Sequence, residues 1–202
     1  GGIRVDGETQ MSTVPGLFAA GECAAGLHGA NRLGGNSLSD LIVFGKLAGQ
    51  HATQFAQENC ATNISSDDVK TALGEALAPL DNKNATDNGG AYQIQYDLQD
   101  IMQSNVGIIR QENEMLEALD EIGKLKKRAE SVAAPGNRQY NPGWHTALDL
   151  QCLLLSAEAV TRSAIVRKES RGAHTREDYK NKEEKFDTVN TILRKGGDGE
   201  MQ

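Results

Sequence analysis

Residues that build metal sites and disulfides are scarce in this sequence. The three cysteines, Cys23, Cys60 and Cys152, lie far apart, and no CxxC or Cys/His spacing of a metal-ligand set occurs. We therefore expect no zinc or iron–sulfur site made by this chain alone, and a reducing, cytosolic setting. No apolar run approaches the length of a membrane span, and the N-terminus carries no signal-peptide pattern.

Positive charge is also in the minority. The 202 residues carry a formal net charge of −7, which argues against nucleic acid as the main partner because phosphate binding needs a basic surface. A hydrophobic content of 38% suffices for one good core, or for one domain and part of another. Because the chain starts within a strand-like segment and ends in "GGDGEMQ", we expect a fragment of a longer polypeptide.

The first 57 residues have the pattern of strands followed by one helix. "IRVD" alternates apolar and polar residues, and "VPGLFAAGE" is a Pro-Gly turn before a strand of small residues. From Asn36 the apolar residues recur at helical spacing, which predicts a buried helix over residues 36–57, packed against a sheet. Asn36 or Ser37 is the expected N-cap of that helix.

The rest of the chain is predicted to be helical. After a polar linker over residues 58–65, apolar residues at helical spacing predict a bundle of three or four antiparallel helices over residues 66–170. On the last helix we expect Leu148, Cys152, Leu155 and Ala159 to face inward, with Tyr140 and Trp144 capping the core. Residues 171–202 form a polar extension with a possible strand at "VNTILR".

Residues 21–49, "GECAAGLHGANRLGGNSLSDLIVFGKLAG", combine the features of a cofactor or anion site. An acid, Glu22, ends a predicted strand; a glycine-rich loop comes next, and a helix then begins. A helix N-terminus offers free N–H groups and positive potential. The guanidinium of Arg32 is a forked donor that matches a carboxylate or a phosphate.

These motifs closely resemble the flavoprotein subunit of succinate dehydrogenases and fumarate reductases. "VPGLFAAGE" and "LHGANRLGGNSLSDLIVFG" carry the resemblance, and "DLQDIMQSNVGIIR" and "RKESRGAHTREDY" are similar to the family's helical domain and to the segment after that domain. The resemblance covers nearly the whole chain, as the C-terminal third of that family. It implies an α/β remnant of an FAD-binding domain followed by an α-helical bundle.

The resemblance also implies residue roles. Glu22 matches the acid that holds the ribityl hydroxyls of FAD, and Ser37 and Leu38 match positions whose backbone contacts the flavin ring. Arg32 matches the arginine that binds a substrate carboxylate. His28 and Asn36 are expected to orient these groups rather than to react. The family's proton-carrying arginine and its pyrophosphate-binding glycines lie upstream, so we expect no catalytic residue in this chain.

The implied activity is hydride transfer between FAD and a dicarboxylate, interconverting succinate and fumarate. Electrons would pass to an iron–sulfur subunit and indirectly to membrane anchor subunits, with this chain peripheral on the cytoplasmic, inner face of the cell membrane. L-Aspartate oxidase, whose motif is closer to "HGANRLASNSL", and a soluble fumarate reductase are alternatives. A non-catalytic docking scaffold is another.

A polar cluster comes after the last predicted helix. Arg171, His174 and Arg176 lie close together in "RKESRGAHTREDY". Two interpretations remain open from the sequence: a contact near a domain or subunit interface, and a surface network of ion pairs.

Overall fold

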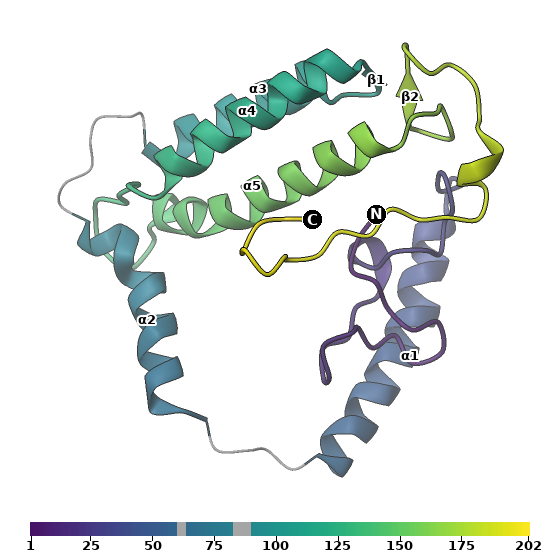
Figure 1. Ribbon diagram of the computed structural model, residues 1–202. Helices are drawn as coiled ribbons and strands as arrows, with labels where there is room; N and C mark the ends of the chain where they lie inside the picture. Colours follow the sequence, from purple (N-terminus) through teal and green to yellow (C-terminus); the bar gives the residue numbers. More distant parts are fainter. Residues whose placement is uncertain (60–63, 83–89) are drawn as a thin grey trace. The chain divides into compact units, whose positions relative to one another are not determined.

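The computed structural model describes residues 1–59, 64–82 and 90–202 (Figure 1). The chain divides into two compact units, Gly1–Ile64 and Ser65–Gln202. Half of the predicted linker over residues 58–65, namely residues 60–63, lies outside the described residues. Within the described ranges, no helix is long and apolar enough to cross a membrane.

The first unit contains one long helix and a series of turns. The strands expected over residues 1–20 are reduced to isolated bridges that pair Ile3 with Ala24, Val5 with Ser12 and Met11 with Phe18. The expected strand end at Glu22 is instead a 3₁₀ turn, Gly21–Cys23 (η1). The alternating pattern of "IRVD" thus corresponds to extended chain, but a strand needs a partner along its length and the described residues of this unit supply none.

Helix α1 spans Asn36–Glu58, as predicted to within one residue. Its N-cap is Gly35, with a φ of +82°, and no side chain caps it, so the expected cap at Asn36 or Ser37 is wrong. The expected burial is also wrong: only Asp40 is buried, and Ile42 is 72% exposed. The part of this unit that the structure describes contains no sheet for the apolar face of α1 to cover.

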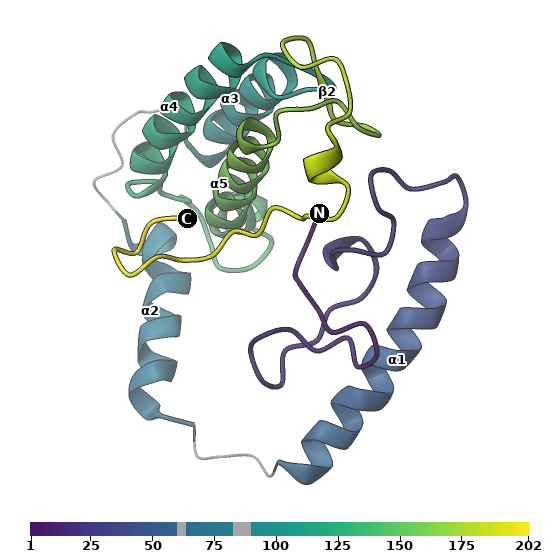
Figure 2. The ribbon, with the colours of Figure 1, turned by 45° about the vertical axis from the view of Figure 1, so that its right-hand side comes forward.

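The second unit is the predicted helical bundle. It consists of α2 (Ser66–Asp81), α3 (Gly90–Asn105), α4 (Glu112–Ala129) and α5 (Pro142–Val166). Figures 1 and 2 show α3, α4 and α5 side by side. Their shared core is made by apolar residues at helical spacing, among them Ile94, Leu98, Ile122, Leu125, Leu150 and Leu154.

Helix α2 contacts the beginning of α5. Its N-cap Ser65 accepts hydrogen bonds from the N–H groups of Asp67 and Asp68, as "SSDD" suggests. At its other end the indole Nε1 of Trp144 donates to the carbonyl of Ala76 at 2.7 Å. Trp144 therefore packs at the end of the core as predicted, whereas Tyr140 is fully exposed and caps nothing.

The inward face of α5 differs from the prediction. Its buried apolar residues include Ala147, Leu150, Leu154 and Ala157, while Cys152 and Leu155 are exposed and Leu148 and Ala159 are half-buried. The reason is that α5 is apolar around most of its circumference, so its hydrophobic pattern does not select one face. Contacts with α3 and α4 make that selection.

The C-terminal segment is tied down by charged side chains. The expected strand over residues 189–194 is absent, and a short parallel pair forms instead between β1 (Ile109–Arg110) and β2 (Thr175–Arg176). A second 3₁₀ turn, η2, spans Glu184–Phe186. The cluster that contains Arg176 is a network of ion pairs, as one of the two interpretations has it, but Arg176 and Glu169 are wholly buried, so the network extends below the surface.

Candidate functional site

The start of α1 is open to a ligand. The N–H of Asn36 donates to the carbonyl of Leu33 at 3.2 Å, and the N–H of Leu38 donates to the carbonyl of Gly35 at 3.2 Å. Among the described residues no acceptor meets the N–H of Ser37, and no side chain caps the helix. Of the two positions whose backbone is predicted to contact the flavin ring, Ser37 has its N–H available at the positive end of the helix, and the N–H of Leu38 is already engaged.

Arg32 lies beside this helix start. Its Nη1 donates to the hydroxyl of Ser37 at 3.3 Å, and the side chain is exposed. Within the described ranges no carboxylate forms an ion pair with Arg32. The guanidinium thus keeps its charge and most of its donors for an external anion, as its predicted substrate role requires.

His28 is held by a buried acid. Its Nε2 lies 3.2 Å from Oδ2 of Asp40, which is only 6% exposed. The pair fixes the loop against α1, and the predicted orienting role of His28 toward a ligand stays a prediction. The sequence patterns did not predict this contact. The available signal was the one acid within a largely apolar stretch, Leu38–Phe44.

A shallow hollow results from this arrangement. It has a volume of about 270 Å³ and lies between the loop and the first two turns of α1. The structure brings His28 and Asn36 together in its wall, as two of the predicted orienting residues. The full lining is Leu27, His28, Asn36, Ser39, Asp40, Val43 and Phe44.

Glu22 is positioned by the glycine before it. Gly21 is buried with a φ of +79°, and a Cβ there would lie 2.5 Å from Cδ2 of Leu41. The 3₁₀ turn therefore packs directly on α1, with the carboxylate of Glu22 exposed and, in the described part of the chain, in no ion pair. A free carboxylate accepts hydrogen bonds from hydroxyl groups, as the predicted cofactor contact requires.

Replacing Gly21 with alanine is expected to lower the free energy of unfolding by about 1–2 kcal/mol, because alanine resists a positive φ and its methyl group meets Leu41. Gly45→Ala, where a Cβ meets nothing within 4 Å, is the matched control and should stabilise by about 0.5–1 kcal/mol. Urea unfolding followed by helical ellipticity measures both. Equal effects of the two changes would contradict the proposed close packing at Gly21.

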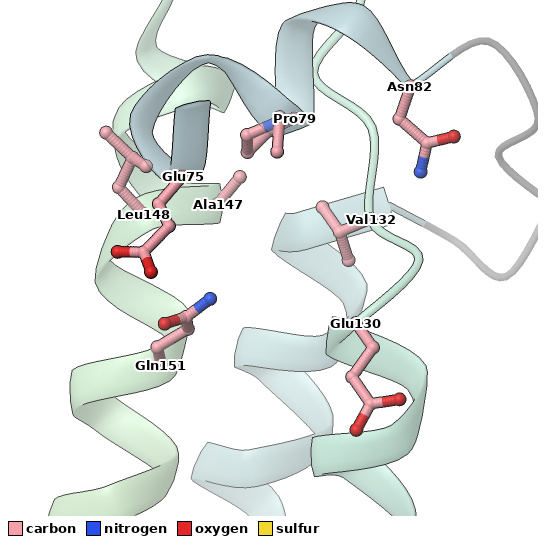
Figure 3. A pocket seen from close by; sticks show the side chains of 9 residues that line it. Glu75, Pro79, Asn82, Glu130, Val132, Ala147, Leu148 and Gln151 are labelled. Carbon is pink, nitrogen blue, oxygen red and sulfur yellow. The ribbon is translucent and has the colours of Figure 1, made fainter. Parts of the chain in front are cut away.

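A second pocket lies in the helical unit (Figure 3). Its volume is about 190 Å³, and Figure 3 shows Glu75 of α2 next to Gln151 of α5. None of the residues predicted for the site lies there. The described residues contain no group of three or more His, Cys, Asp or Glu side chains that could hold a metal ion. The lining is Glu75, Ala78, Pro79, Asn82, Glu130, Val132, Ala147, Leu148 and Gln151.

Comparisons with known proteins agree with the two-part architecture. Residues 95–202 match the family described as "Fumarate reductase flavoprotein C-term", and residues 1–38 match the family described as "FAD binding domain". The cofactor expected from the sequence, FAD, is thus the one that the second family name states. The match over residues 95–202 includes most of the bundle and the whole C-terminal segment.

Relatives match along nearly the whole chain. A fumarate reductase flavoprotein subunit of Haemophilus influenzae is 38% identical over 182 residues, 89% of this chain and 30% of the relative. The solved Sdh1 complex of Mycobacterium smegmatis has 46% identity and a TM-score of 0.84, covering 89% of this chain and 30% of the other. A quinol fumarate reductase chain of Escherichia coli has 31% identity and a TM-score of 0.82; the match covers 100% of this chain and 35% of the other. The chain therefore spans about a third of the length of the proteins it matches.

Proposed function

Because the chain belongs to the family of fumarate reductase and succinate dehydrogenase flavoprotein subunits, we propose that it forms part of a flavin-dependent oxidoreductase that interconverts succinate and fumarate. The observation that carries the proposal is Arg32, an exposed guanidinium without a carboxylate partner among the described residues, beside an open helix N-terminus. Together they form a binding site for a carboxylate next to a site for a polar cofactor.

The residues of the loop and helix fit FAD by their chemistry. Glu22 supplies an exposed acceptor for ribityl hydroxyls, and Ser37 supplies an N–H without an internal acceptor. The positive end of α1 favours negative charge placed beside it, and Leu38 at the same turn has a 66% exposed side chain for contact with a flat ring. When bound, FAD supplies the hydride-transfer chemistry of the reaction.

Arg32 binds one carboxylate of the dicarboxylate in this proposal. Two parallel N–H groups of a guanidinium match the two oxygens of a carboxylate, and the pairing fixes the direction of the substrate's carbon chain. The hydrogen bond to Ser37 holds the side chain near the helix start. His28 and Asp40 hold the loop that carries Arg32. No residue of this chain is assigned the proton-transfer step.

We propose the partners by the same inference. The electrons pass to an iron–sulfur subunit and from it to membrane anchor subunits, and the chain lies peripherally on the inner face of the cell membrane. One relative, from Wolinella succinogenes, is an 8-methylmenaquinol:fumarate reductase flavoprotein subunit, 38% identical over 183 residues. Its name supports a quinol as the distant electron carrier for this type of enzyme.

The test uses the intact polypeptide that carries these residues, purified and examined for flavin absorbance. We expect bound FAD, succinate oxidation with an artificial dye and fumarate reduction with a reduced dye. Oxidation of L-aspartate in place of succinate would reassign the enzyme to the aspartate oxidases, and would overturn the proposed substrate. Bound flavin without turnover of any dicarboxylate would overturn the proposed role of Arg32, and absence of flavin would favour the docking scaffold.

A further inference from the structure

His174 joins three parts of the helical unit. It lies in the turn after α5, where the backbone N–H of Arg171 donates to the carbonyl of His174 at 2.8 Å and the N–H of His174 donates back at 3.0 Å. Its ring lies 2.9 Å from the carbonyl of Arg167 through Nε2 and 2.7 Å from Nη1 of Arg110 through Nδ1. The ring therefore ties the turn both to the end of α5 and to β1.

The two ring contacts specify one protonation state. A carbonyl only accepts a hydrogen bond, so Nε2 must carry the hydrogen that meets Arg167. A guanidinium only donates, so Nδ1 must offer a lone pair to Arg110. The imidazole is consequently neutral in the folded state, with its hydrogen on Nε2. A second proton on Nδ1 would point at the N–H of Arg110 across the same 2.7 Å gap.

Arg110 has little freedom to move away from that proton. Its Nε donates to the carbonyl of Val106 at 3.2 Å and to the carbonyl of Gly107 at 2.7 Å. Its own backbone belongs to β1, and its carbonyl accepts from the N–H of Glu177 at 3.0 Å. Protonation of His174 must therefore break the contact rather than be accommodated by rotation of the arginine.

The charges around the ring also disfavour protonation. Burial, together with the positive charges of Arg110, Arg176 and Arg167, lowers the pKa of His174 below its usual 6.5. In the described part of the chain no carboxylate oxygen lies within 4 Å of a ring nitrogen of His174.

The nearby acids already have partners. Glu169 pairs with Arg167 and Arg171, and Asp178 pairs with Arg176. The other acids of the cluster are engaged as well: Glu112 with Lys168 and Arg176, Glu177 with Gln111, and Asp187 with Arg171. A charge on His174 would thus have no carboxylate in direct contact with it in the described part of this cluster.

We propose that His174 is an acid-sensitive latch that holds the segment 167–178 against β1, and that its protonation opens this junction. The inference is independent of the proposed catalytic function, because it rests on the second unit alone. Opening would release the pairing of β1 with β2 and expose the buried ion pairs beneath it. The α3–α4 connection and the C-terminal segment would then move separately.

The direction of the pH effect is set by proton binding. With its pKa lowered in the closed state, His174 binds fewer protons there than in the open state, where its pKa is near 6.5. The closed state therefore has its full stability above about pH 6.5 and loses it as the pH falls below that value. Opening is coupled to the uptake of one proton by His174. Between pH 6.5 and the lowered pKa of His174, the equilibrium constant for opening therefore rises by up to about tenfold for each unit that the pH falls.

Hydrogen exchange in the intact polypeptide between pH 5 and 8 tests the latch. The amides to follow are those of Arg171, His174, Arg176 and Glu177, corrected for the intrinsic pH dependence of exchange. We expect their opening constants to be flat above pH 6.5 and to rise below it. His174→Gln keeps a donor and an acceptor but cannot titrate, so its opening constants should not change with pH. His145→Gln, an exposed position on α5, should behave as the unmodified protein.

A direct measurement keeps the proposal testable if the variant does not fold. Nitrogen-15 spectra of histidine-labelled, unmodified protein report the protonation of each ring nitrogen. We expect His174 to show an unprotonated Nδ1 at pH 6.5 and to titrate below that value. A charged His174 ring at pH 6.5, a pH-independent opening constant in the unmodified protein, or the same acid response in His174→Gln would each overturn the latch.

Discussion

Replacing Arg32 with alanine is expected to lower succinate and fumarate turnover about 100- to 1000-fold while FAD stays bound. The magnitude corresponds to the loss of a charge-assisted donor at a reacting anion, about 3–4 kcal/mol. Flavin should remain because the 3.3 Å hydrogen bond to the hydroxyl of Ser37 is the only hydrogen bond of the Arg32 side chain in the described part of the structure. Flavin absorbance and dye-linked turnover of the intact polypeptide, measured on the same preparation, separate the two effects.

Two further variants sharpen this test. Arg32→Lys keeps the charge but loses the fork that matches a carboxylate, so it should recover only a small part of the lost turnover. Arg4→Ala removes another exposed arginine of the same unit and should leave turnover unchanged. Turnover of Arg32→Ala within about threefold of the unmodified enzyme (well under 1 kcal/mol) would show that the arginine only supports the loop.

Replacing Arg176 with methionine is expected to destabilise the helical unit by about 2–3 kcal/mol, because it removes the charge-assisted hydrogen bonds of a buried guanidinium to partly exposed carboxylates. Arg176 is wholly buried and donates through Nε and Nη2 to both oxygens of Asp178 at 2.7 and 2.6 Å. It also reaches Glu112 at 3.3 Å and the carbonyl of Ala164 at 2.9 Å. The bond from Arg176 holds the pKa of Asp178 below its usual 3.8, and that stabilisation would be lost with the arginine.

The measurement is urea unfolding followed by the fluorescence of Trp144, the one tryptophan of the sequence, which lies in the helical unit. Arg138→Met is the matched control, since Arg138 is exposed and its loss should cost less than about 0.5 kcal/mol. Arg176→Lys should lower the free energy of unfolding by an amount between those of Arg176→Met and Arg138→Met, because lysine keeps the charge without the bidentate geometry. If the urea concentration at the midpoint of unfolding were the same for Arg176→Met and Arg138→Met, the proposed stabilising role of Arg176 would be refuted.

Local sequence patterns were sufficient where the residues concerned interact with near neighbours. The bounds of α1 follow from apolar spacing after Asn36, and the cap of α2 follows from Ser65 before two acids. The placement of Arg32 next to the start of α1 also follows from a short loop that leads into a helix. The functional roles of Glu22, Arg32, Ser37 and Leu38 came from the resemblance to a family, and they remain predictions.

Sequence patterns gave wrong or incomplete predictions where the conformation or burial of a segment depends on the elements that pack against it. The face of α5 that turns inward is selected by α3 and α4, because α5 carries apolar residues on most sides. The N-cap of α1 falls on Gly35 because the loop needs a positive φ there, which no periodicity reveals. Residues 171–202 were predicted only as a polar extension, and polarity alone does not reveal that Arg176 is wholly buried.

The sequence by itself determined the helices, the division into a loop-and-helix unit and a bundle, and the family, because these depend on local spacing and on continuous motifs. Only the tertiary structure decided which polar groups meet: His28 with Asp40, His174 with Arg110, and Arg176 with Asp178 and Glu112. The physical reason is that a buried charge is stable only when folding brings partners to it, and most of these partners are distant in the chain. His174 and Arg110 lie 64 residues apart and meet at 2.7 Å.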